Sequence, residues 1–170
     1  ADHAGTHRRG DGVTVAAHMK LHLISGGAAH GLVAALADEF RAATGCEIAG
    51  EFGAVGAMKD KLIAGAPADL VILTAESIAD LEAKGHVAPG SAVDIGSVHA
   101  GIATRTGDAL PAIRDAASLR AALRAADAIY FPDPARATAG IHFQKVMRQL
   151  GIADELAARV RTFPNGAAAM

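Results

Sequence analysis

Small residues at three strand-to-helix junctions are the feature of this sequence best suited to chemistry. In the segments 20–40, 46–65 and 128–151, a β-prone apolar run ends in a loop of Gly, Ala, Ser or Thr that opens into an amphipathic helix. The first N–H groups of a helix lack partners within the helix and have partial positive charge, and these loops place no bulky side chain over them. Three such junctions predict one negatively charged ligand that is held mainly by backbone amides.

The titratable residues near these junctions form no recognisable catalytic set. His30 and His142 lie near helix starts and could contact an anion or transfer a proton, but a solvent-facing or capping role also fits them. Lys59 and Lys61 flank Asp60, a pattern typical of a solvated helix face. The sequence has no Ser/His/Asp order, no paired carboxylates beside a junction, no metal-ligand spacing and no GxGxxG fingerprint. We therefore expect no catalytic residue, no metal site and no cofactor.

Composition and charge limit the class of protein. The chain has 170 residues, of which 51% are hydrophobic and 4% aromatic, and this indicates an α/β protein with a core of small side chains, as one domain or two small lobes. Its 16 basic and 18 acidic residues are scattered, so we expect no nucleic-acid partner. Cys46 is the single cysteine and has no partner for a disulfide.

The first 18 residues differ in character from the rest of the chain. Residues 1–18 are polar apart from a short apolar stretch at 13–17, and we interpret them as a disordered leader. That stretch is too short for a signal-peptide core or a membrane span. We therefore expect no membrane insertion.

From Met19 onward, β-prone runs alternate with helical patterns, as in parallel sheets covered by helices. The predicted strands are 20–25, 46–52, 69–74, 98–105, 128–131 and 159–163. The predicted helices are 28–43, 57–64, 76–83, 116–126, 138–150 and 152–158.

Apolar spacing predicts which side of each early helix faces the core. In the first helix the predicted inward residues are Leu32, Ala35, Leu36 and Phe40, and in the second they are Met58, Leu62 and Ile63. The segment 86–97 has the most turn residues, so we place a lobe boundary just after it. The predicted organisation is a first lobe at 19–97, a crossover strand at 98–106 and a second lobe at 107–170.

Three stretches of the sequence resemble a known family: SGGAAHG at 25–31, the block 52–74 with its GAPADLVI motif, and the block 131–151 with its DP and AGI motifs. They are similar to the molybdate-binding-protein-like solute receptors, and the resemblance runs over 19–170. It implies a type 2 periplasmic-binding fold, with two parallel-sheet lobes covered by helices and a ligand in the cleft between them. It also implies capture of a small anion for transport or sensing, and a membrane component of an ABC transporter as partner.

The resemblance further assigns four ligand loops by their place in the motifs. The implied ligand-binding residues are Ser25, Gly26, Gly27, Ala28, Gly53, Ala54, Val55, Gly56, Thr138, Ala139, Gly140, Asn165 and Gly166.

The sequence departs from the family pattern in two ways. Ala28 and Val55 stand where the molybdate receptors present serine hydroxyls, so the expected ligand is a small carboxylate as readily as a molybdate-like oxyanion. The receptors also continue for several further elements that return to the first lobe. We therefore expect the second lobe and the return crossover to be incomplete, as in a C-terminally truncated receptor.

A second hypothesis is kept beside the binding protein. An isomerase or lyase of small organic acids would use the same scaffold, with His30 or His142 as proton carrier. We expect a binding protein rather than an enzyme because no catalytic set accompanies either histidine. The resemblance implies a periplasmic location, whereas the visible residues show no signal peptide and are compatible with the cytoplasm.

Overall fold

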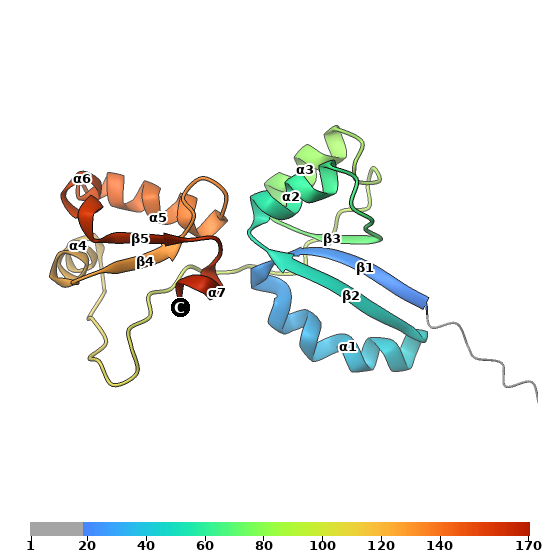
Figure 1. The fold of residues 1–170 in the computed structure, drawn as a ribbon, viewed down its shortest axis with the longest axis horizontal. Coiled ribbons are helices and arrows are strands. Elements are labelled where there is room, and N and C mark those ends of the chain that lie inside the picture. The colour runs from blue at the N-terminus through green and yellow to red at the C-terminus, as the bar shows by residue number, and fades with distance from the viewer. Residues whose placement is uncertain (1–18) are drawn as a thin grey trace, which may run out of the picture.

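The structure is a computed structural model that describes residues 19–170, so the leader predicted for 1–18 lies outside the described residues. Two separate α/β lobes follow one another along the chain (Figure 1). The first contains a three-stranded sheet in the order β2-β1-β3, and the second a two-stranded sheet of β4 and β5. All strand pairs are parallel, as the alternation of strands and helices predicts.

The first lobe is built from three strand–helix units. Its strands are β1 (Met19–Gly26), β2 (Cys46–Gly53) and β3 (Leu70–Ile72). Its helices are the short 3-10 helix η1 (Gly27–Ala29), α1 (His30–Thr44), α2 (Val55–Ile63) and α3 (Ala75–Ala83). Helix α1 covers one face of the sheet, and α2 and α3 cover the other (Figure 1). Gly45 ends α1 in the left-handed region at φ 72°, the conformation that favours glycine at this position.

The face of α1 that packs on the sheet is not the predicted one. Leu32 and Leu36 are each 48% exposed and Ala35 is also exposed, whereas Val33, Ala37 and Phe40 are half-buried. Phe40 is thus the only correct member of the predicted stripe. The helix is apolar on two sides, so the spacing of its residues could not decide which side contacts β2. In α2, Met58 is buried and Leu62 half-buried as expected, but Ile63 is exposed.

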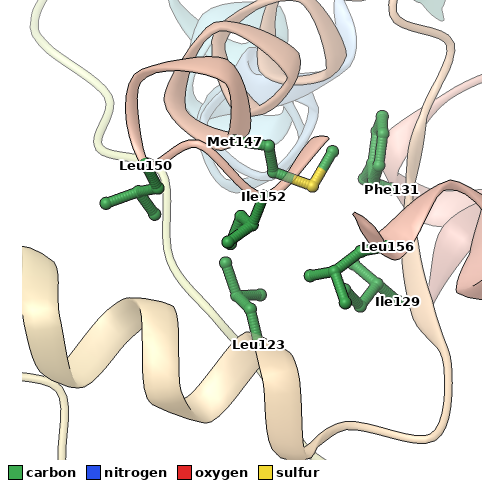
Figure 2. Packing of buried hydrophobic residues seen from close by; sticks show 7 residues of the cluster. All are labelled: Leu123, Ile129, Phe131, Met147, Leu150, Ile152 and Leu156. Atoms are coloured by element: carbon green, nitrogen blue, oxygen red, sulfur yellow. The ribbon is translucent and has the colours of Figure 1, made fainter. Parts of the chain in front are cut away.

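The second lobe has a compact apolar core. Its elements are α4 (Ala116–Ala125), β4 (Ile129–Pro132), α5 (Thr138–Gln149), α6 (Ala153–Leu156), the 3-10 helix η2 (Ala157–Arg159), β5 (Val160–Phe163) and α7 (Gly166–Ala169). Side chains from α4, β4, α5, α6 and the turn before α6 meet in one cluster (Figure 2). Its buried members are Leu123, Ile129, Phe131, Met147, Leu150, Ile152 and Leu156. Burial of these side chains is the main stabilising contribution to the lobe.

The segment between the lobes corrects one prediction. Residues 98–105, predicted as a strand, form neither helix nor strand, and the same holds for 91–97. A strand is stable only when a neighbouring strand pairs with it, and within residues 19–170 neither sheet pairs with this segment. The crossover at 98–106 is therefore an exposed segment without regular secondary structure. The separate sheets before and after it agree with the predicted division into two lobes.

Candidate functional site

The first two predicted loops lie side by side at one edge of the first sheet. In the parallel register of β1 and β2, Ser25 is opposite Phe52 and Gly26 is opposite Gly53. A Cβ placed on Gly27 would lie 3.7 Å from the Gly53 carbonyl oxygen. The carboxyl ends of parallel strands are where ligands bind in open α/β sheets. The structure thus brings together the loops 25–28 and 53–56.

The third and fourth predicted loops are neighbours in the second lobe. Pro132 of β4 is opposite Phe163 of β5, and the Asp133 N–H donates to the Phe163 carbonyl at 2.7 Å. The loops that follow these strands lead into α5 and α7. Residues 138–140 and 165–166, at the starts of α5 and α7, therefore follow strands that end at the same edge of the second sheet.

Arg136, in the loop after β4, contacts helix α2, which follows β2 in the first lobe. The Gly56 N–H, in the first turn of α2, donates to the Arg136 carbonyl at 3.0 Å. The Arg136 guanidinium also donates to Asp60 Oδ2 at 2.6 Å. Because Arg136 immediately precedes the N-cap of α5, these contacts place the start of α5 beside the start of α2.

The helices at the first three junctions share a lack of side-chain caps. The first junction opens into η1, which has Gly26 as its N-cap and continues into α1 through a hydrogen bond from the His30 N–H to the Gly27 carbonyl. The N-cap residues of α2 and α5 are Ala54 and Ala137, and at none of these three starts does a side chain accept a hydrogen bond. Thr74, Asp115 and Asn165 cap α3, α4 and α7 with their side chains, whereas the short helix α6, with Ile152 as its N-cap, has no side-chain cap either. Helix starts without a cap leave N–H groups for another acceptor. An anion is the acceptor that such groups favour.

The hydrogen bonds at these helix starts show what residues of three predicted loops do in the structure. Thr138 is the first residue of α5, and Ala137 is its N-cap. Asn165 uses its Oδ1 atom to accept the Ala168 N–H at 2.9 Å, so this side chain stabilises α7. The Gly56 N–H is likewise bonded to Arg136 and is not free for a ligand.

The predicted site residues differ in exposure: some are buried in the junctions, and others are accessible to a ligand. Ser25 is fully buried, and its hydroxyl donates to the Gly26 carbonyl at 2.9 Å. Gly140 is buried, and a Cβ there would run into the carbonyl oxygens of Pro132 and Asp133. Gly26 is buried as well, so these three predicted residues pack inside the junctions. The exposed members are Gly27, Ala28, Thr138, Ala139 and Gly166, and the half-buried ones are Gly53, Ala54, Val55, Gly56 and Asn165.

The lysines of α2 are paired with carboxylates. Lys59 Nζ lies 2.6 Å from Asp80 Oδ2, and Lys61 pairs with Glu51. Asp80 also pairs with Lys84 at 2.8 Å. The hydrogen bond from Lys59, followed by that from Lys84, lowers the pKa of Asp80 from 3.8 to about 2. The Lys59–Asp80 pair therefore links α2 to α3, and the Lys61–Glu51 pair links α2 to β2, so both lysines already have anionic partners.

The two candidate proton carriers lie in different lobes and environments. The His30 ring packs against Phe52 with ring centroids 4.6 Å apart. His142 contacts the edge of Phe143 and lines an apolar groove of about 420 Å³ between the 98–113 segment and the helices α4 and α5. None of the predicted loop residues lines this groove. Among residues 19–170, no group of three His, Cys, Asp or Glu side chains could hold a metal ion.

Sequence reasoning missed Arg136 as a residue of this region. Its contribution is a backbone carbonyl and an ion pair with Asp60, a residue 76 positions earlier in the chain. Neither is visible from residue type. Gly56 offered the only signal, because a glycine in a helix start can mark a close approach of two backbones.

In the described part of the chain, no helix has the length and apolar character needed to span a membrane.

Comparisons with known proteins agree with the geometry. The family described as bacterial extracellular solute-binding protein has a sequence model that matches residues 21–170. A comparison with curated protein sequences gave no significant match. Among solved structures, the fold is similar to that of the Azotobacter vinelandii periplasmic molybdate-binding protein, with a TM-score of 0.66 and 20% sequence identity. The alignment covers 88% of this chain and 64% of that one. The similarity confirms the predicted two-lobed periplasmic-binding fold.

Proposed function

Because the chain belongs to the bacterial extracellular solute-binding protein family, we propose that it captures a small anion between its two lobes for delivery to a membrane transporter. The observation that supports this most is the absence of side-chain caps at the starts of η1, α2 and α5, which follow strands β1, β2 and β4. Several backbone N–H groups can bind one anion without a charged side chain. The proposed partner is the membrane component of an ABC transporter.

The proposed ligand is a molybdate-like oxyanion or a small carboxylate. Val55 and Ala28 supply methyl groups and no hydroxyl donors at the first two junctions. An apolar wall beside amide donors suits a ligand that is anionic at one end and has carbon at the other, so the carboxylate is as well supported as the oxyanion. The similarity to the molybdate-binding protein supports the fold alone, so experiment must decide between the oxyanion and the carboxylate.

Calorimetry with molybdate, sulfate and acetate tests whether the full chain binds an anion. Mass spectrometry of the purified protein adds an independent test, since a tightly held ligand copurifies. Binding of one anion at a single site supports the proposal. Failure of all three probes, together with the absence of any copurified small anion, would contradict it.

A proline substitution tests whether backbone amides are the donors. Thr138→Pro removes one first-turn N–H of α5 at a position where proline fits, because Ala137 before it is extended with φ −101° and ψ 127°. A hydrogen bond to a charged group contributes about 1.5–3 kcal/mol, so affinity should fall by tenfold or more. Thr138→Ala controls for the hydroxyl. Ala116→Pro is the matched control at the first residue of α4, whose start is capped by Asp115.

A further inference from the structure

Arg136 of the second lobe makes hydrogen bonds to two residues of α2 in the first lobe. Gly56 and Asp60 are four residues apart and therefore lie on the same face of this helix. The carbonyl of Arg136 accepts the Gly56 N–H at 3.0 Å, and its guanidinium donates to Asp60 at 2.6 Å. Among residues 19–170, these are the two hydrogen bonds that connect the lobe containing β1–β3 with the lobe containing β4 and β5.

The approach at Gly56 is too close for a side chain. A Cβ on this residue would lie 2.8 Å from the Arg136 carbonyl oxygen and 3.4 Å from its Cα. Both are backbone atoms, which no rotamer change can move aside. Any other residue at position 56 would therefore push the two lobes apart. The helix itself would accept alanine, which is a better helix former than glycine.

The two bonds to Arg136 differ in expected strength. The side chains of Arg136 and Asp60 are 54% and 65% exposed, and ion pairs in such positions contribute little and weaken with salt. The other hydrogen bond joins two backbones at Gly56, which is half-buried. We therefore expect this backbone contact to hold the lobes together more strongly than the exposed ion pair does.

We propose that Gly56 and Arg136 form a latch that holds the lobes together around the ligand, with glycine required at position 56 by the close approach of Arg136. This inference rests on the proposed function, because closure of the lobes is the step that would enclose the anion. The latch positions the starts of α2 and α5 relative to one another and is not a ligand contact. Gly56 thus has a role different from the amide donor suggested by its family motif.

Distances between spin labels test the latch without any ligand. Labels attached through Glu76→Cys on α3 and Gln149→Cys on α5, in a Cys46→Ala background, report the separation of the lobes in the full chain; both label positions are exposed. We expect Gly56→Ala to shift the distances to longer values. The matched control is Gly31→Ala in α1, where an added Cβ meets nothing within 4 Å and no shift is expected.

Anion affinity is measured on the same variants. Since apparent affinity scales with the fraction of molecules in the binding-competent state, we expect Gly56→Ala to bind the anion about tenfold more weakly and Gly31→Ala to bind as the parent does. If no variant binds any anion, the proposed function fails while the distances still decide the latch. Unchanged distances in Gly56→Ala would overturn the latch even where the parent protein binds an anion.

Asp60→Asn tests the second hydrogen bond made by Arg136, with no steric change, and serves if Gly56→Ala does not fold. It should lengthen the label distances less than Gly56→Ala does, and the effect should disappear at high salt. An effect of Asp60→Asn larger than that of Gly56→Ala would overturn the main role given to the backbone approach. No lengthening in Asp60→Asn at low salt would remove the ion pair from the latch.

Discussion

Val55 lies against Gly26, so that its Cγ2 atom would be 3.2 Å from a Cβ placed on that glycine. The Cγ2 methyl group of the first residue of α2 thereby lies against the end of β1. This contact joins the first two junctions directly, and it places the valine side chain in the region where the molybdate-like resemblance implies a hydroxyl donor.

Val55→Ser should strengthen binding of tetrahedral oxyanions. One added hydroxyl donor in a partly desolvated site contributes about 1 kcal/mol, which corresponds to roughly fivefold to tenfold in affinity. Calorimetry with molybdate, sulfate and acetate measures the change for each class of anion. Val93→Ser, at an 81% exposed position between the lobes, is the control and should leave affinity unchanged. Unchanged or weaker oxyanion binding in Val55→Ser would show that the side chain does not face the ligand.

Gly140→Ala should destabilise the second lobe. The added methyl group would meet the carbonyl oxygens of Pro132 and Asp133, which are fixed parts of the loop between β4 and α5. Overpacking of this kind costs about 1–3 kcal/mol of unfolding free energy. Urea unfolding followed by circular dichroism measures it, and Gly166→Ala, where an added Cβ meets nothing within 4 Å, is the control. Equal stability of the two variants would mean that the start of α5 rearranges freely.

Asp80→Asn should change how stability depends on pH. Lys59 and Lys84 lower the pKa of Asp80 to about 2 in the folded state, from the ordinary value of 3.8. Between these values the unfolded chain binds more protons, so the stabilisation is complete above about pH 4 and is lost as the pH falls through about 2. The difference in unfolding free energy between parent and variant should therefore shrink over this range.

Urea unfolding at several pH values between about 2 and 5 measures this difference. Asp94→Asn, in the exposed segment between the lobes, is the control for losing one acidic charge without a lysine pair. A parent-minus-variant difference for Asp80 that stays constant as the pH falls would contradict the prediction.

The strands of both lobes could be predicted from the sequence because each of them pairs with another strand of its own lobe. The runs at 20–25, 46–52 and 128–131 correspond to β1, β2 and β4 within one or two residues. The run at 98–105 is equally apolar and β-prone, yet it forms no strand. β-propensity describes how a residue fits a pleated surface, and it has no effect where no strand pairs with the segment.

The candidate site was predictable in its location and less so in its detail. The junction pattern correctly indicated that loops 25–28 and 53–56 meet, since parallel strands end at one edge of a sheet. It could not show that Gly56 donates to Arg136, because that bond depends on how the lobes lie and involves a backbone carbonyl. Nor could it separate the buried Gly140 from the exposed Ala139 beside it. The ligand role of these loops stays a prediction.

Matched leucine substitutions decide which face of α1 is inward. Leu36→Ala should have little effect, below about 1 kcal/mol, because Leu36 is 48% exposed in the structure. Leu81→Ala in α3 removes the same atoms from a fully buried side chain and should lower the unfolding free energy by about 2–5 kcal/mol. Urea unfolding of both variants provides the comparison. A loss in Leu36→Ala as large as that in Leu81→Ala would restore the packing face predicted from the sequence and show that Leu36 is covered in solution.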